Sequence, residues 1–330
     1  MSSYNVAVVG ATGAVGEALI EILEQREFPV DQLFPLASER SAGTTVMFRN
    51  KRHIVGNLAE FDFSQVQIGL FSAGGSVSEE YAPKAADAGC VVIDNTSHFR
   101  YEDDIPLVVP EVNVASIADY RVRNIIANPN CSTIQMVVAL KPIYDIAGIK
   151  RISVATYQAV SGTGKSAVKE LAGQTGELLN GRDAKCEVYP QQIAFNALPQ
   201  IDVFMDNGYT KEEMKMVWET RKIFADDTIA VSATCVRVPV FYGHSEAIQV
   251  ETREPLSAEA ARKLLAAAPG ITVIDKPSDG KYPTAVHDSA GQDAVFVGRI
   301  RQDISFPNGL NLWVVADNLR KGAALNSIQI

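Results

Sequence analysis

One cysteine lies where a reactive thiol is most useful. Residues 128–133 read NPNCST, and residues 134–146 form an apolar run that permits a helix. A cysteine that only filled space would sit further along the apolar face, whereas Cys131 precedes that run. At the start of a helix the positive end of the helix dipole favours the thiolate, which is the nucleophilic form. The pattern therefore predicts a catalytic nucleophile at Cys131, if the chain also supplies a base.

His244 is the histidine that best fits the role of that base. It follows the β-type run VRVPV in the segment YGHSE, and Arg237 lies seven residues earlier. An arginine within a strand requires an anion, and a substrate carboxylate can bind its guanidinium through two hydrogen bonds. The other histidines lie in charged or polar segments where a surface position is expected: His53, His98 and His287.

A glycine-rich turn near the N-terminus has a spacing that suits a dinucleotide. Gly10, Gly13 and Gly16 follow the apolar run 4–9 in a G-x-x-G-x-x-G pattern. Glycines there let the backbone approach a pyrophosphate, which then rests at the N-terminus of the next helix. The pattern alone is not specific, so an ordinary strand-to-helix turn is the alternative interpretation.

Two later segments bear on the choice of nucleotide. The predicted second strand ends in Ser-Glu-Arg-Ser, residues 38–41. Glu39 could hold the ribose hydroxyls of NAD, but Arg40 beside two serines suits a 2′-phosphate, so we favour NADP. Residues 72–75, SAGG, end another predicted strand and either line the same site or form only a turn.

Residues 162–166, GTGKS, resemble the end of a phosphate-binding P-loop. The full motif requires a glycine five residues before Gly164, and that position is Ala159. We therefore reject an ATPase and expect a turn after the strand that carries Gln158.

Composition narrows the class of protein. The chain has 330 residues, of which 47% are hydrophobic and 21% charged, as expected for a globular protein of two domains. The formal charge of -9 argues against nucleic acid or an anionic membrane as the main partner. No apolar run reaches the ~20 residues of a membrane span, and no signal peptide is evident.

The other three cysteines, Cys90, Cys186 and Cys235, fit ordinary apolar or surface roles. The absence of CxxC pairs and histidine clusters predicts no metal site and a cytoplasmic location.

The first third of the chain alternates strands with helices, which predicts a parallel, doubly wound sheet. Strands are expected at 4–10, 32–38, 67–75, 89–97 and 124–127, with helices at 14–25 and 77–88.

Longer β-type runs follow Cys131 and predict an α+β domain with a large mixed or antiparallel sheet. Strands are expected at 150–162, 228–243, 246–255, 294–305 and 310–318, with helices around 164–180, 210–223 and 257–268. The predicted domains are 1–127, joined by a C-terminal helix of about 314–330, and 128–313.

Taken together, these segments resemble the aspartate-semialdehyde dehydrogenases over essentially the whole chain. The resemblance is carried by GATGAVG near the start, SAGGSVS at 72–78, VIDNTSHFR at 92–100, NPNCST at 128–133, QAVSG at 158–162, EEMKMVWETRKI at 212–223, RVPVFYGHSE at 237–246 and WVVADNLRKGAA at 313–324. It implies a Rossmann-like domain and a catalytic, dimerising domain of the glyceraldehyde-phosphate-dehydrogenase type. It also implies a homodimer formed through the second domain.

The resemblance implies a catalytic role for three residues. Cys131 forms a thioacyl enzyme, Gln158 orients the acyl intermediate, and His244 is the acid/base. The chemistry agrees independently, because the product aldehyde oxygen needs a proton, which a nearby imidazolium can give. The reaction is the NADPH-dependent reduction of aspartyl phosphate to the semialdehyde, with release of phosphate, in the biosynthesis of lysine through diaminopimelate and of threonine, methionine and isoleucine.

Other matched positions are implied to bind substrate and cofactor. Arg237 binds the α-carboxylate and Glu212 lies near the amino group, while Arg100 and Lys215 receive the phosphate. The cofactor contacts implied are Gly10, Thr12, Gly13, Ala14, Val15, Gly16, Ser38, Arg40, Ser41, Ser72, Ala73, Gly74 and Asn318.

Two other interpretations are weighed against this one. Another acyl-phosphate or acyl-thioester reductase of the superfamily would not need Glu212, which suits an amino group. A binding or structural relative without the chemistry should have lost Cys131 or His244, and both are present.

Overall fold

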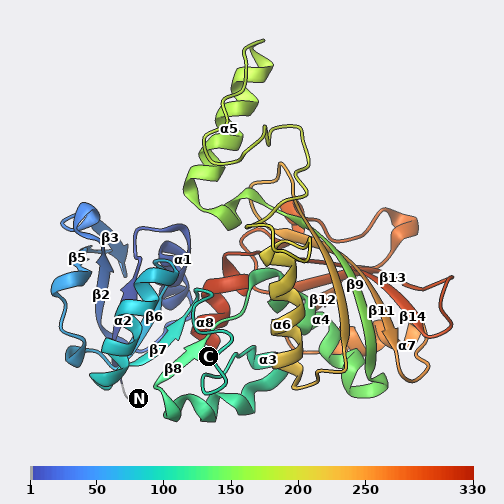
Figure 1. The fold of residues 1–330 in the computed structure, drawn as a ribbon, viewed down its shortest axis with the longest axis horizontal. Helices are drawn as coiled ribbons and strands as arrows, with labels where there is room; N and C mark the ends of the chain where they lie inside the picture. The colour runs from blue at the N-terminus through green and yellow to red at the C-terminus, as the bar shows by residue number, and fades with distance from the viewer. Residues whose placement is uncertain (1–2) are drawn as a thin grey trace. The chain divides into compact units, whose positions relative to one another are not determined.

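The computed structural model describes residues 3–330, which form two compact units (Figure 1). The first unit holds the described residues up to Asn130 together with Ala323–Ile330, and the second holds Cys131–Gly322. The predicted helix of about 314–330 is wrong in its first part. Residues 314–316 end strand β14 (Gly309–Ala316), and only α8, Leu325–Gln329, is α-helical.

The first unit contains the predicted parallel sheet. Its six strands have the order β5-β2-β1-β6-β7-β8, and every neighbouring pair is parallel. Short apolar runs suit such strands because both faces of the sheet are covered. The bounds are β1 Tyr4–Val9, β2 Val30–Ala37, β5 Gly56–Asn57, β6 Ile68–Phe71, β7 Val91–Asp94 and β8 Ile125–Ala127.

The crossover helices of this unit are α1, Ala14–Gln25, and α2, Gly75–Asp87, with the short α3 at Pro110–Asn113. α1 packs against β1 and α8 around one apolar core. A hairpin of β3, Thr45–Phe48, and β4, Lys51–Ile54, was not predicted. Further 3₁₀ turns lie at Glu39–Ser41, Leu58–Glu60, Phe63–Gln65 and Val114–Val122.

The second unit contains a mixed six-stranded sheet, as predicted, in the order β10-β9-β11-β14-β13-β12. β10 with β9 and β12 with β13 are parallel pairs, and the others are antiparallel. The predicted strand 228–243 ends at Arg237, since Pro239 has no N–H for a ladder. The bounds are β9 Ile149–Gln158, β10 Ala230–Arg237, β11 His244–Thr252, β12 Ile271–Val273, β13 Val295–Gln302 and β14 Gly309–Ala316.

Helices α4, α6 and α7 contact this sheet, and α5 packs with the segment around 188–198 in a smaller core (Figure 1). No helix among residues 3–330 is long and apolar enough to cross a membrane. The bounds are α4 Cys131–Ala147, α5 Lys165–Leu179, α6 Lys211–Phe224 and α7 Ala258–Ala267, with shorter turns at Val160–Thr163, Pro277–Asp279, Ala285–Ser289 and Arg320–Ala324.

The strand ends of the second unit bring three polar side chains to one end of the sheet. β9 ends at Gln158 and β10 ends at its register partner Arg237, while the antiparallel β11 begins at His244. The last six residues of the predicted strand, 238–243, are instead the loop that returns the chain to the same end.

Candidate active site

Cys131 is the first residue of α4 and is half-buried, as the sequence predicted for the nucleophile. Two other cysteines are poor nucleophiles because burial disfavours their thiolates. Burial raises the pKa of Cys90 to about 12 and also raises the pKa of Cys235. Cys186 is exposed and lies outside the helices and strands. Cys131 alone of the four combines access with the favourable helix end.

His244 is fully buried, and one of its ring nitrogens is held by the backbone. Nδ1 accepts a hydrogen bond from the Ala159 N–H at 3.0 Å, so a neutral ring carries its proton on Nε2. Nε2 has no hydrogen-bond partner within residues 3–330. Burial, and then the charge of Arg237, hold the pKa of His244 well below its ordinary value. Burial therefore favours the neutral ring, with Nε2–H as a hydrogen-bond donor, and the acid/base role of His244 stays a prediction.

Arg237 is 4% exposed and faces the same space as His244. Its Nη1 donates to the Ala159 carbonyl oxygen at 2.7 Å, while its Nε has no hydrogen-bond partner in the described chain. A methyl group at Gly162 would lie 3.0 Å from Arg237 Nη1 and 3.3 Å from His244 Nε2. A buried cation with an unsatisfied donor requires an anion, which agrees with a carboxylate site beside Gly162.

The helix that begins at Cys131 is tied to the strand that begins at His244. Gln135 lies four residues after Cys131 and therefore on the same face of α4. Its Nε2 donates to the His244 carbonyl oxygen at 3.4 Å. The first turns of α4 consequently lie against the start of β11, which brings the predicted nucleophile to the region of the predicted acid/base.

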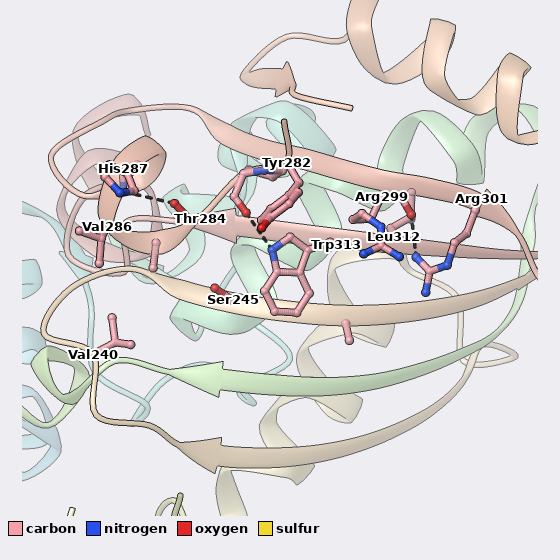
Figure 2. Close-up of a pocket in the computed structure, with 13 residues that line it drawn as sticks. Val240, Ser245, Tyr282, Thr284, Val286, His287, Arg299, Arg301, Leu312 and Trp313 are labelled. Carbon is pink, nitrogen blue, oxygen red and sulfur yellow. Dashed lines mark hydrogen bonds between the residues drawn. The ribbon is translucent and has the colours of Figure 1, made fainter. Parts of the chain in front are cut away.

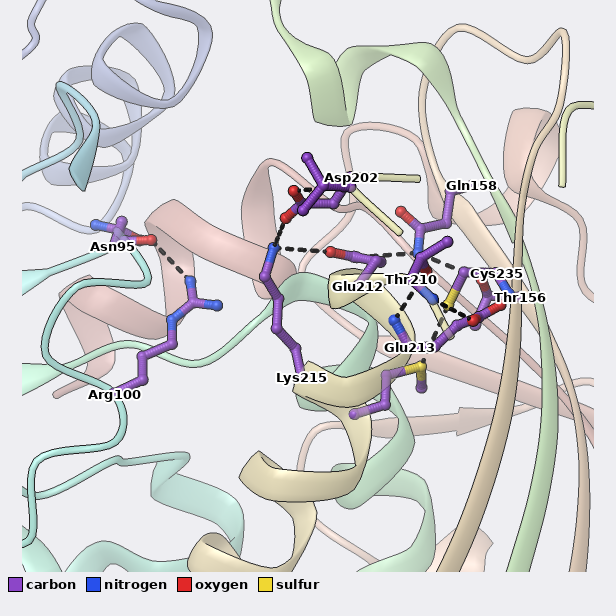
Figure 3. A network of polar contacts seen from close by, with 12 residues as sticks. Asn95, Arg100, Thr156, Gln158, Asp202, Thr210, Glu212, Glu213, Lys215 and Cys235 are labelled. Carbon is purple, nitrogen blue, oxygen red and sulfur yellow. Dashed lines mark hydrogen bonds and ion pairs between the residues drawn. The ribbon is translucent and has the colours of Figure 1, made fainter. Parts of the chain in front are cut away.

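Gln158, Glu212 and Lys215 form one polar network (Figure 3). Gln158 Nε2 donates to Glu212 Oε1 at 3.1 Å and to Thr156 Oγ1 at 3.3 Å. Lys215 Nζ lies 3.1 Å from Glu212 Oε2 and 2.8 Å from Asp202 Oδ2. The Lys215 side chain is only 12% exposed, so its ion pairs with Glu212 and Asp202 are not ordinary surface pairs.

Arg100 belongs to the first unit and is 6% exposed. Its Nη2 donates to the Asn95 carbonyl oxygen at 2.9 Å (Figure 3), and its charge acts on the buried Asp94 carboxyl. This anchoring fixes the guanidinium in place, and its role in binding phosphate stays a prediction.

The residues predicted to bind nucleotide in the first unit gather at the carboxyl ends of adjacent strands. Gly10 follows β1 with φ +88°, and a methyl group there would lie 3.0 Å from Ser72 Oγ, just after β6. A methyl group at Gly16 would lie 2.1 Å from the Gly10 carbonyl oxygen. Gly13 is the N-cap of α1 and leaves that helix end without a side-chain cap. Residues 38–41 follow β2, on the other side of β1. The glycines thus allow tight packing between the turn, β6 and α1, and the helix N-terminus without a side-chain cap suits a pyrophosphate.

Asn318 lies in the second unit and is 3% exposed. Its Oδ1 accepts from the Gly243 N–H at 3.0 Å and lies 3.1 Å from Ser161 Oγ. It thereby joins the loop before His244 to the loop after Gln158. The predicted contact between Asn318 and the cofactor is untested and stays a prediction.

Three residues of this region were not identified from the sequence. Asp202 pairs with Lys215, although it lies thirteen positions earlier in an irregular segment. Glu246 is fully buried beside Gln135, and its only sequence signal is its two-residue spacing from His244 within a strand. No pattern in the sequence indicated Gln135, which reads as one polar residue within an apolar helix.

The chain matches known proteins over nearly its whole length. Residues 5–120 match the family model described as semialdehyde dehydrogenase, NAD binding domain, and residues 140–321 match semialdehyde dehydrogenase, dimerisation domain. It is 68% identical to the aspartate-semialdehyde dehydrogenase of Legionella pneumophila over 99% of this chain and 94% of that protein. The Vibrio cholerae aspartate semialdehyde dehydrogenase II structure complexed with ASA has a TM-score of 0.98 and 63% identity, covering 100% of this chain and 97% of that one. The Candida albicans enzyme structure with NADP has a TM-score of 0.78 and 27% identity, covering 99% and 97%.

Gly322 provides a test of how tightly Cys131 is held. A methyl group at Gly322 would lie 2.8 Å from Cys131 Cβ, so Gly322→Ala must displace the start of α4. We expect slower alkylation of Cys131 by iodoacetamide, and a kcat lower by about 10- to 100-fold, because misplacing a reacting group by ~1 Å costs that much. Gly173→Ala on α5, where nothing lies within 4 Å of the added methyl, is the control. Unchanged alkylation in Gly322→Ala would contradict the steric constraint.

Proposed function

We propose that this chain, which belongs to the aspartate-semialdehyde dehydrogenase family, reduces L-aspartyl 4-phosphate to L-aspartate 4-semialdehyde with NADPH and releases phosphate. The observation that carries the proposal is the meeting of Gln158, Arg237 and His244 at one end of a sheet on which the helix of Cys131 packs. The pathway is the biosynthesis of lysine, threonine, methionine and isoleucine.

Cys131 begins the reaction as a thiolate. Its sulfur attacks the acyl phosphate carbonyl, a C–S bond forms, and the C–O bond to phosphate breaks with the electron pair leaving on phosphate. When bound at the glycine turn of the first unit, NADPH supplies the hydride that reduces the resulting thioester. Breaking the C–S bond then releases the aldehyde and regenerates the Cys131 thiolate.

His244 acts on the carbonyl oxygen of the Cys131 adduct. Its neutral Nε2–H donates a hydrogen bond to this oxygen as negative charge develops, which lowers the barrier. An anion bound at Arg237 would offset part of the positive charge that depresses the pKa of His244. Substrate binding and the acid/base role of His244 are thereby coupled.

The remaining polar side chains bind and orient the substrate. Arg237 binds the α-carboxylate, and Glu212 receives the ammonium group while it holds the Gln158 amide. Arg100 and Lys215 receive the phosphate, and the two carboxylates beside Lys215 offset part of its charge. Glu212 is the residue that favours an amino-acid substrate over an N-acetylated or glycolytic one.

Removing the sulfur of Cys131 tests the covalent mechanism. Cys131→Ala should lower NADP reduction with aspartate semialdehyde and phosphate by roughly four orders of magnitude or more, because no thioacyl enzyme can form. Binding of NADP, measured by calorimetry, should be retained. Cys186→Ala, at an exposed position, is the matched control. Normal turnover in Cys131→Ala would exclude the mechanism.

We propose NADP rather than NAD as the preferred cofactor. Arg40 is exposed just after β2, near Ser38 and Ser41, where a ribose 2′-phosphate would be expected. Arg40→Ala should raise the KM for NADP by about 10- to 100-fold, because charge-assisted hydrogen bonds are lost. The KM for NAD should change little. Steady-state kinetics with both nucleotides measures this. Equal loss for both nucleotides, or loss for neither, would contradict the 2′-phosphate assignment.

We propose that the chain is a homodimer formed through the outer face of the second sheet. α4, α6 and α7 contact the sheet, while its outer face carries a cavity of about 820 Å³ lined by residues such as Trp313, Tyr282 and Val286 (Figure 2). The rings of Trp313 and Tyr157 lie 5.6 Å apart across β11. A second copy is the expected partner because residues 140–321 match a dimerisation domain.

We also propose a cytoplasmic location, since no disulfide joins the cysteines of the described chain.

A charged substitution on the outer face of the second sheet tests whether this face forms the dimer interface. Ala247 lies on β11 between Ala155 and Trp313 and lines the cavity. Ala247→Arg should shift the mass measured by light scattering toward the monomer, because an unpaired cation would be buried in the interface. Ala266→Arg on the exposed side of α7 should leave the mass unchanged. A dimeric Ala247→Arg variant would place the interface elsewhere.

A further inference from the structure

Glu246 is a buried acid that the proposed mechanism does not use. It lies on β11 two residues after His244, so both side chains project to the same face of the sheet. Its exposed fraction is 0%, and neither carboxyl oxygen has a hydrogen-bond partner within residues 3–330. Gln135 of α4 is 1% exposed, and its Oε1 also lacks a partner in that part of the chain.

The Gln135 amide lies beside the Glu246 carboxyl and also contacts the backbone of His244. Gln135 Nε2 donates to the His244 carbonyl oxygen at 3.4 Å. The same amide lies close enough to Glu246 to lower the pKa of its carboxyl. Burial is the larger effect and raises the pKa of Glu246 well above its ordinary value. Burial therefore favours the neutral carboxyl, which carries a proton that it can donate.

The groups around Glu246 offer no counter-charge. Thr156 of β9 and Val314 of β14 lie opposite it, and burial favours the neutral form of His244 on its own strand. Cys235 of β10 is the nearby titratable group whose pKa Glu246 affects, and burial keeps that thiol protonated. An ionised carboxylate here would have no cation and no donor for Gln135 Oε1, which is costly in a buried site.

We propose that Glu246 is a positioning residue, whose neutral carboxylic acid and the Gln135 carboxamide hydrogen-bond to each other and hold the start of α4 against the start of β11. The acid O–H donates to the amide oxygen, and an amide N–H donates to the acid carbonyl, so the unsatisfied atoms are paired together. The pair then fixes Cys131, one turn before Gln135, relative to His244. Its importance for turnover rests on the function proposed above.

Two substitutions at Glu246 separate a neutral pair from other roles. Glu246→Gln keeps a group that both donates and accepts, whereas Glu246→Leu keeps similar bulk without hydrogen bonds. We expect Glu246→Gln to retain kcat within about 3-fold, and Glu246→Leu to lose about 10- to 100-fold in kcat with little change in KM, as for a misplaced reacting group. The double variant Glu246→Leu with Gln135→Leu should lose no more than Glu246→Leu alone, because the residues act as a unit.

Two readouts do not depend on aspartyl phosphate. The pH profile of Cys131 alkylation by iodoacetamide should match wild type in Glu246→Gln and change in Glu246→Leu, while NADP binding stays constant in both. Absence of semialdehyde dehydrogenase activity in the wild type would defeat the proposed function but leave the alkylation result intact. If the kcat of Glu246→Gln falls as far as that of Glu246→Leu, the carboxyl acts in its ionised form. If Glu246→Leu matches wild type in both assays, Glu246 does not position the site. Either result overturns the proposal.

The pH dependence of stability gives an independent readout if Glu246→Leu folds poorly. The folded-state pKa of Glu246 is raised, so its contribution to the free energy of unfolding is fully present at low pH and is lost as pH rises from the ordinary carboxyl range. Glu246→Gln cannot ionise, so its melting temperature relative to wild type should rise with pH over that range. A constant difference across pH would contradict a neutral Glu246.

Discussion

The site depends on the backbone of a single residue, Ala159, which lies one residue beyond β9. Its N–H fixes the His244 ring at Nδ1 and its carbonyl fixes Arg237 at Nη1, at 3.0 and 2.7 Å. Both contacts are to backbone atoms, so no side-chain change at that position removes them directly. Because buried polar groups must be paired, the remaining polar edges of the ring and of the guanidinium are left to face Gly162. The backbone of Ala159 thus holds side chains from the ends of β10 and β11 beside the end of β9, where they line one binding space.

The Arg237 guanidinium and the His244 imidazole can both carry positive charge, and they share this enclosed space. The guanidinium of Arg237 is charged, and burial together with that charge holds the pKa of His244 well below its ordinary value. A carboxylate bound at Arg237, as proposed for the substrate, would offset the smaller of these two effects. Burial is the larger cause of the lowered pKa of His244 and the charge of Arg237 the smaller, and a sequence motif conveys neither.

The helix-facing side of the second sheet is apolar along most of its length and polar near the site. Gln158 contacts Glu212 of α6, and His244 contacts Gln135 of α4 through its carbonyl oxygen. Each of these two helices thus makes a directed contact close to its N-terminus. Hydrogen bonds among buried groups add modest net stability, but they select one register, and a catalytic arrangement requires that selection.

The sequence by itself determined the features that rest on local pattern. Alternating apolar runs predicted both sheets, and the glycine turn and the helix beginning at Cys131 lie as predicted, because strand, turn and helix-end preferences act within a few residues. The β3–β4 hairpin was missed because Arg49 and Asn50 adopt positive φ without the glycine that usually signals such a turn. Only the tertiary structure decided that Glu246 faces inward, that Asp202 meets Lys215, and that burial lowers the pKa of His244. Burial and charge at those positions are set by segments distant in the chain, and no local pattern records them.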